Sequence, residues 1–159
     1  MTNTKIQHYQ ELADQVQALI AGESNMIANM ANISAVLYWG LKNVNWAGFY
    51  VLQEQQLVLG PFQGKPACIR IPLGKGVCGT AAADSQVQMI DDVHQFAGHI
   101  ACDAQSNAEI VLPVYQSGKV IAVLDIDSTV IARFDEDDKQ GLQKIVDIFQ
   151  QSLQLGVKN

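Results

Sequence analysis

The spacing of apolar residues changes period twice along this chain, and that change limits the folds open to it. Between residues 4 and 39 apolar residues recur at helical spacing in two segments, which Gly22 separates and Gly40 ends. From 45 to 127 the spacing is that of short strands, and from 135 to 155 it is helical again. Two helices, five or six strands and a closing helix predict an α+β fold with a mainly antiparallel sheet.

The strand-forming region is the longest part of this pattern. Gln116-Ser117-Gly118 predicts a tight hairpin between its last two strands, and Asp135 is expected to cap the closing helix. Residues 91–107, rich in Asp, His, Gly and Ser, predict a long loop of the kind that is usually functional in a compact domain. The expected strands span residues 45–52, 56–60, 67–73, 86–90, 109–115 and 119–127, with a short helix over 77–84.

Charge and composition exclude several classes of protein. The 159 residues include 10 basic and 16 acidic ones, a formal net charge of −6 that disfavours nucleic acids and anionic membrane surfaces as partners. No apolar run is as long as a membrane span and no secretion signal is recognisable, so a cytoplasmic location is expected. With 48% hydrophobic residues the chain can fill one core. We therefore expect a single domain over residues 1–159, with N-terminal helices at about 4–39, sheet and loops at about 44–128 and a closing helix at about 135–155.

Two aromatic residues are predicted to share one face of the first strand. Alternate residues of a strand point the same way, so Trp46 and Tyr50 lie on one face and Gly48 leaves space between them.

Carboxylates follow the same pattern in the last strand. Asp125 and Asp127 share a face at the end of an apolar strand, and Glu109 opens the strand before it. An unpaired carboxylate among apolar neighbours is costly to bury, so these groups face either water or a polar ligand. Together with the two aromatics they suit a small ligand with an ammonium group and an apolar tail. The alternative is a pair of core aromatics with solvated carboxylates, which spacing alone favours slightly.

Two glycine-rich segments resemble nucleotide-binding loops but fail on context. The segment from Gly74 to Gly79 matches G-x-G-x-x-G, yet the helix after it is too short for a βαβ crossover and the acid expected about 20 residues later is missing. The segment from Gly60 to Lys65 is one residue short of a P-loop and lacks the Ser or Thr that should follow. Nucleotide binding by either segment is rejected.

The three cysteines indicate thiol chemistry more strongly than a metal site. Cys68, Cys78 and Cys102 are an odd number, which argues against a secreted disulfide scaffold, and with His94 and His99 they lack the close pairs of structural zinc sites. Cys78 lies near a helix N-terminus, close to a lysine, where its pKa is expected to be lowered; on this argument it is the nucleophile, with an inert buried thiol as the even alternative.

Several segments taken together resemble the free methionine-(R)-sulfoxide reductases, which have the GAF fold. The resemblance runs from about residue 38 to 142, places all three cysteines at family positions, and departs at Ala97, where proline is expected. It rests on the segments NWAGFY (45–50), LGPFQGKPAC (59–68), GKGVCGT (74–80), DVH (92–94), GHIACD (98–103), EIVLP (109–113) and LDIDS (124–128).

The resemblance implies a reaction and roles for individual residues. It implies reduction of free L-methionine-(R)-S-oxide, with Cys102 as nucleophile in place of Cys78, Cys68 resolving the intermediate as a disulfide, and Cys78 as an auxiliary thiol. It also implies that thioredoxin reduces the disulfide with electrons drawn indirectly from NADPH, and that no cofactor or metal is tightly bound. The implied substrate pocket consists of Trp46, Tyr50, Glu109, Asp125 and Asp127, the residues that strand periodicity groups independently.

Three further expectations stay open beside this reaction. A GAF domain can instead be a sensor for a cyclic nucleotide or small metabolite, and Phe134-Asp135-Glu136 resembles a sequence of cyclic-nucleotide GAF domains. The same three residues are also typical of the acidic first turn of an ordinary helix. A structural zinc protein is the third class. The apolar faces of the N-terminal helices are compatible with a homodimer formed through them.

Overall fold

Six strands form one antiparallel sheet in the computed structural model, which describes residues 2–100, 102 and 105–155. The strand order across the sheet is β3-β2-β1-β6-β5-β4, and every neighbouring pair is antiparallel. In chain order the elements are α1 (Thr2–Leu19), α2 (Met26–Gly40), β1 (Trp46–Gln53), β2 (Gln56–Gly64), β3 (Arg70–Pro72), α3 (Gly76–Asp84), β4 (Gln88–Ile90), the short 3-10 helix η1 (Val93–Gln95), β5 (Ala108–Gln116), β6 (Lys119–Ser128) and α4 (Glu136–Gln154).

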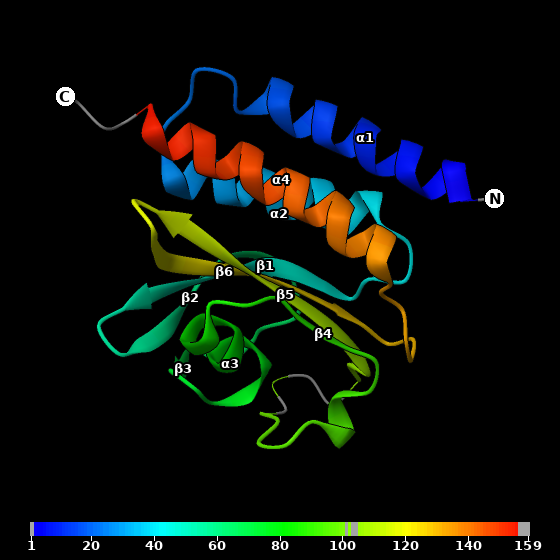
Figure 1. Ribbon diagram of the computed structural model, residues 1–159, viewed down its shortest axis with the longest axis vertical. Coiled ribbons are helices and arrows are strands. Elements are labelled where there is room, and N and C mark those ends of the chain that lie inside the picture. The colour runs from blue at the N-terminus through cyan, green and yellow to red at the C-terminus, as the bar shows by residue number, and fades with distance from the viewer. Residues whose placement is uncertain (1, 101, 103–104, 156–159) are drawn as a thin grey trace.

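Helices cover the two faces of this sheet unequally. Figure 1 shows α1, α2 and α4 grouped above the sheet, with α3 and the loop around η1 below it. Helices α2 and α4 contact the strands, and α1 packs on both helices. The α+β class and the antiparallel sheet expected from the sequence are confirmed.

Alternate residues of the central strands belong to two separate hydrophobic clusters. On β1, Ala47 and Phe49 face the helical layer, whereas Trp46 and Tyr50 face α3. Strand β6 divides in the same way, with Leu124 and its alternates in the larger cluster under the helices. The site described below is therefore built on the reverse side of the strands that hold the main core.

Strand β2 is longer than predicted because a β-bulge carries it past a proline. The prediction ended this strand at Gly60, but it continues to Gly64, and the register with β1 shifts between Gly48 and Tyr50. Two residues of β2, Gly60 and Pro61, then lie opposite one residue of β1. A bulge tolerates a proline, which has no N–H to give to the ladder.

The other two deviations are short strands at the sheet edges. The third strand was predicted over 67–73 but is limited to Arg70–Pro72, and the fourth was predicted over 86–90 but is limited to Gln88–Ile90. The predicted long loop at 91–107 also contains the helical turn η1. Before β3 the chain leaves the ladder, because side chains of β1 hold it instead: Trp46 Nε1 donates to the carbonyl of Lys65 and Tyr50 Oη to that of Cys68.

Helix α4 begins as the sequence predicts, and its first turn anchors α1. The Asp135 carboxylate accepts from the backbone N–H of Asp138, and the Asp138 carboxylate accepts from the N–H of Asp135, a reciprocal capping box. The fully buried Asp138 side chain also accepts from Tyr9 Oη (2.6 Å), Lys5 Nζ (2.6 Å) and Arg133 (3.1 Å). The motif around Asp135 therefore has a structural explanation. No helix in the described part of the chain has the length and hydropathy to cross a membrane.

Candidate active site

Three carboxylates and an indole come together through the register of three strands. Trp46 on β1 is the register partner of Asp127 on β6, and Asp127 is the partner of Glu109 on β5. Asp125 lies two residues from Asp127 on the same face, opposite Gly48. Glu109 and Asp125 are buried and Asp127 is half-buried. The sheet thus brings together all three acids that strand periodicity placed on this face.

The aromatic side of the site is a stack of three rings. The centroid of the Trp46 ring lies 5.9 Å from the ring centroid of Tyr50 and 5.1 Å from that of Phe62 on β2. The ring planes are nearly parallel in both pairs. The expected space beside Gly48 is filled: a Cβ at that position would lie 2.3 Å from Cβ of Phe62. Gly48 therefore serves the close approach of β2, which brings a third ring to the site.

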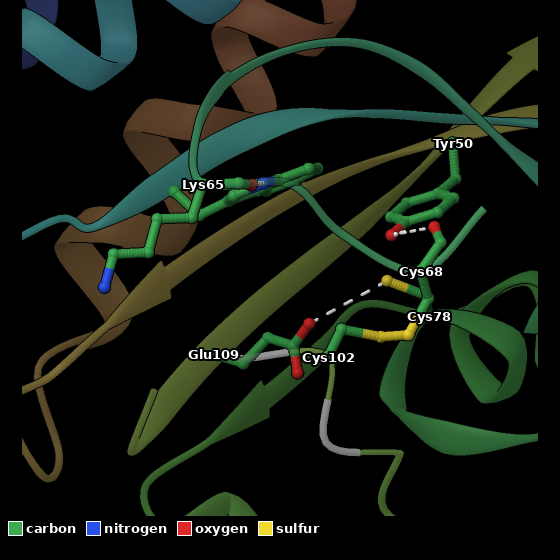
Figure 2. The surroundings of a disulfide bond; sticks show 7 residues. Tyr50, Lys65, Cys68, Cys78, Cys102 and Glu109 are labelled. Atoms are coloured by element: carbon green, nitrogen blue, oxygen red, sulfur yellow. Dashed lines mark hydrogen bonds between the residues drawn. A yellow bond between two sulfur atoms is a disulfide. The ribbon is translucent and has the colours of Figure 1, made fainter. Parts of the chain in front are cut away.

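A disulfide joins Cys68, in the segment before β3, to Cys102, in the long loop. The two residues are 34 apart in sequence and their Cα atoms lie 5.4 Å apart, and Figure 2 shows the bond next to Glu109 and the Cys78 thiol. The pairing implied by the family resemblance is present. Cys68 was predicted to open a strand; it precedes β3 instead, with its carbonyl accepting from Tyr50 Oη at 2.9 Å.

These groups surround one cavity of about 40 Å³. A volume of this size holds roughly three waters. Its walls include Cys102 and Cys78, the five residues expected to bind substrate, and apolar side chains from β3, α3 and the loop: Trp46, Tyr50, Ile71, Val77, Cys78, Ile100, Cys102, Glu109, Asp125 and Asp127. Cys68 is not among the lining residues and reaches the cavity only through its bond to Cys102.

The sequence-based prediction that Cys78 has a lowered pKa is wrong. Cys78 is the third residue of α3, but it is buried, and its sulfur donates to a carboxylate oxygen of Glu109 at 3.8 Å (Figure 2). Burial, followed by the charges of Asp125 and Glu109, raises its pKa well above the ordinary value. Lys75, expected to favour the thiolate, is exposed at the surface. Desolvation and acidic neighbours outweigh the helix terminus here, and the thiol is protonated at neutral pH.

The two buried carboxyl groups have raised pKa values for the same physical reasons. Burial comes first for both; the charge of Asp125 then raises the pKa of Glu109, and that of Asp127 raises the pKa of Asp125. Asp125 Oδ1 is buried and lacks a hydrogen-bond partner in the described structure. The raised pKa values favour the protonated form of these groups, and a proton held by the pair would let one carboxyl group donate to the other.

The histidines of the long loop lie at the edge of this cavity. His99 lines it, and its Nδ1 is buried without a partner among the described residues. The His94 ring lies 6.2 Å from that of His99, and its Nε2 contacts Asn107 Oδ1 at 3.0 Å. Burial, and then the charge of His94, lower the pKa of His99, which favours a neutral ring.

The group of side chains that could hold a metal ion differs from the cysteine and histidine set considered in the sequence analysis. Cys68 and Cys102 are bonded to each other, whereas Cys78, Glu109 and Asp125 have one ligand atom each within 4.8 Å of one another. The donor set is one thiol and two carboxylates. The hydrogen bond from Cys78 to Glu109 and the raised pKa values of both acids already give these three groups partners within the site.

Sequence reasoning missed two residues of this site. Phe62 does not line the cavity but supports Trp46 from behind through the bulge of β2, and the only signal in the sequence was a glycine at the partner position, Gly48. His99 was considered as a metal ligand, and its position three residues before Cys102 was the available signal for a role at the thiol.

Comparisons with known proteins agree with one another. A family model described as GAF domain matches residues 33–154. The chain is 58% identical over 142 residues to the Escherichia coli (strain K12) protein named free methionine-R-sulfoxide reductase, covering 89% of this chain and 86% of that protein. A Saccharomyces cerevisiae protein of the same name is 42% identical over 90% of this chain and 84% of that protein.

A solved structure shows the same likeness in three dimensions. It is the X-ray structure of free methionine-R-sulfoxide reductase from Neisseria meningitidis in complex with its substrate. It superposes with a TM-score of 0.89 at 40% identity, covering 92% of this chain and 89% of that chain. The chain belongs to the GAF-domain family of free methionine-R-sulfoxide reductases.

Proposed function

We propose that this protein reduces free L-methionine-(R)-S-oxide to L-methionine, and that thioredoxin supplies the electrons. The observation that carries the proposal is the Cys68–Cys102 disulfide, which borders a cavity lined by stacked aromatics and buried acids. Family membership supports the same reaction. A thiol pair beside a polar and aromatic cavity suits a small oxidised sulfur compound.

In the first step the Cys102 thiolate attacks the sulfoxide sulfur. The S–O bond breaks, a proton is delivered to the oxygen, and Cys102 becomes a sulfenic acid as methionine leaves; the thiol is oxidised and the sulfoxide is reduced. The proton donor is Glu109 or Asp125, since burial and neighbouring charge raise the pKa of each.

In the second step the Cys68 thiol attacks the sulfenic sulfur of Cys102. A disulfide forms and the oxygen leaves as water, which yields the bond that the structure contains. The thioredoxin dithiol then exchanges with this disulfide. Both cysteines return to thiols, and thioredoxin leaves as a disulfide. Cys78 stays outside these steps, because it is buried and protonated.

Substrate selection follows from the two sides of the cavity. Trp46 and Tyr50 give an apolar surface for the methyl end, with Phe62 stacked behind Trp46, and the acids give a negative surface for the ammonium group. A methionine inside a peptide has an amide in place of that ammonium group. Its apolar end would fit, but the buried acids would face a neutral group, so free methionine sulfoxide is preferred.

The test is NADPH oxidation in the presence of thioredoxin and thioredoxin reductase. Free L-methionine-(R)-S-oxide, the S epimer and a peptide-bound sulfoxide are compared, and turnover of the free R epimer alone is expected. A parallel assay with dithiothreitol separates the reaction from the reductant. Turnover with dithiothreitol but not with thioredoxin would contradict only the electron donor. No sulfoxide reduction with either reductant would contradict the proposed enzymatic activity and favour a GAF sensor.

A further inference from the structure

The proposed substrate carries a carboxylate, and no positively charged side chain lines the described part of this cavity. This inference rests on the proposed function. The described lining residues include the acids Glu109, Asp125 and Asp127 but no lysine or arginine. A zwitterionic amino acid would therefore bring its anionic group into a site that is negative on one side. Some donor must offset that repulsion for free methionine sulfoxide to bind well.

The two strongest neutral donors of the aromatic wall are already engaged. Trp46 Nε1 donates to the carbonyl of Lys65 at 3.1 Å, and Tyr50 Oη donates to the carbonyl of Cys68 at 2.9 Å. Both bonds hold the segment before β3 in place. The Lys65 ammonium group donates to Gln105 at 3.3 Å, and Figure 2 shows it extending away from the disulfide.

His99 is the lining residue with a buried and unused polar atom of the right kind. Its Nδ1 has no partner in the described structure although it is shielded from water, an arrangement that costs free energy unless a ligand completes it. Its backbone N–H donates to the carbonyl of Phe96 at 3.2 Å, which fixes the start of the turn leading to Cys102. The ring and the nucleophile are thus carried by one loop, three residues apart.

We propose that His99 binds the α-carboxylate of the substrate through a hydrogen bond from Nδ1–H. The imidazole donates as a neutral ring in the Nδ1–H tautomer. The acids on β5 and β6 take the ammonium group, and the loop that carries Cys102 takes the carboxylate. Both charged groups of a free amino acid are then recognised beside the sulfur that reacts.

The experiment compares two substrates in the reduced enzyme. One is L-methionine-(R)-S-oxide, and the other is (R)-3-(methylsulfinyl)propylamine, which has the same sulfoxide and ammonium groups but no carboxylate. The preference is the ratio of the two kcat/KM values, measured with dithiothreitol as reductant. In His99→Ala this preference is expected to fall roughly 10- to 100-fold, mostly through KM for methionine sulfoxide, with the amine nearly unaffected. His99→Asn, whose amide N–H lies at the position of Nδ1–H, should recover part of it.

Two other variants serve as controls. His94→Ala removes the neighbouring ring, which contacts Asn107 and does not line the cavity, and should leave the preference unchanged. Ser106→Ala removes a hydroxyl that lines the cavity and accepts from Asn45, and should also keep the preference.

Each outcome decides the matter. Equal losses for both substrates in His99→Ala would place the imidazole at the sulfoxide end and overturn the proposal, as would loss of the preference in Ser106→Ala alone. A wild-type enzyme that reduces methionine sulfoxide without any preference over the amine would overturn the role of His99 but leave the proposed function intact. A wild-type enzyme that reduces neither compound would overturn both.

Discussion

Glu109 on β5 and Asp127 on β6 lie directly opposite each other as register partners of an antiparallel pair. Like charges at such positions destabilise a sheet. Asp125, two residues along β6, adds a third acid to the same face and is buried. Grouping these acids costs stability where they are ionised, and a ligand with a positive group, as proposed above, would offset that cost. The arrangement gives the first prediction.

Replacing Asp125 with asparagine should stabilise the protein at alkaline pH. The pKa of Asp125 is raised in the folded state above the ordinary value of 3.8, so the folded state holds a proton that the unfolded state has lost. Wild-type stability therefore falls as the pH rises above about 4 toward the folded-state pKa. At pH 8 we expect Asp125→Asn to unfold with a free energy about 1–3 kcal/mol higher than wild type, and at pH 4 with nearly the same value. Urea unfolding at both pH values measures this. The control is Asp84→Asn, at an exposed residue. If Asp125→Asn raised the unfolding free energy equally at both pH values, the stabilisation would not arise from the protonation of Asp125.

The two bonded cysteines should fail in different ways when replaced. Cys102→Ser should abolish reduction of methionine sulfoxide with any reductant, because the nucleophile is missing. Cys68→Ser should form one methionine per enzyme and then stop with thioredoxin, whereas dithiothreitol should sustain turnover by reducing the sulfenic acid directly. Quenched single-turnover assays measure the methionine formed. Continued thioredoxin-driven turnover in Cys68→Ser would show that Cys78 resolves the intermediate instead.

The Cys78 thiol should resist alkylation in the folded protein. It is the free cysteine of the oxidised protein, is only 4% exposed, and has a pKa raised first by burial and then by Asp125. Iodoacetamide at pH 8 should modify it on the order of a hundredfold more slowly in the folded protein than in urea. Mass spectrometry of timed samples gives both rates. Equal rates would mean that the thiol is accessible and ionised, as the sequence alone had suggested.

An alanine at Gly48 should weaken both the fold and the proposed substrate site. Its Cβ would lie 2.3 Å from Cβ and 2.8 Å from Cα of Phe62, so β1 and β2 would be pushed apart. We expect a loss of about 1–3 kcal/mol in unfolding free energy and a higher KM for methionine sulfoxide, because Phe62 stacks on Trp46.

The matched comparison is Gly118→Ala in the hairpin between β5 and β6. That glycine has a φ of +77° and open space around its Cβ position, so alanine there is strained without displacing a neighbour. Its KM should match that of wild type. Equal changes in KM for the two variants would show that the Phe62 contact is unimportant for binding.

Removing the buried charge of Asp138 should loosen the helical layer. The carboxylate accepts from Tyr9, Lys5 and Arg133 in a buried position, so its loss would leave the Tyr9 hydroxyl without this acceptor and remove one carboxylate partner from each of the two cations. Asp138→Ala should cost about 3–5 kcal/mol, and Tyr9→Phe about 1.5–3 kcal/mol. Chemical denaturation followed by circular dichroism measures both. Asp137→Ala, one residue away in the same helical turn, should cost only a few tenths of a kcal/mol, and a similar loss in this control would point to the helix terminus rather than the buried network.

The parts of the structure that depend on local periodicity were predictable. The order of elements, the cap at Asp135 and the shared faces of Trp46 with Tyr50 and of Asp125 with Asp127 all follow from spacing and capping rules. These features need no knowledge of what packs on the far side of each strand.

The features that depend on distant neighbours were not predictable from local pattern. The pKa of Cys78 is raised first by burial and then by Asp125 and Glu109, which are more than 30 residues away in sequence. The course of β2 past Pro61 depends on a bulge against β1, and the buried Nδ1 of His99 depends on how the long loop closes. The homodimer and the cytoplasmic location stay predictions.

The division of β1 and β6 between two hydrophobic clusters has a consequence for sequence change. Even-numbered positions of β1 such as Trp46 border the cavity, and odd-numbered positions such as Phe49 fill the space beneath the helices. The two sets interdigitate in sequence but have no side-chain neighbours in common across the sheet. Substitutions on the cavity side can therefore accumulate, and alter which small molecule is accepted, while the helical layer keeps its packing. The same scaffold can be refitted for a new ligand one face at a time.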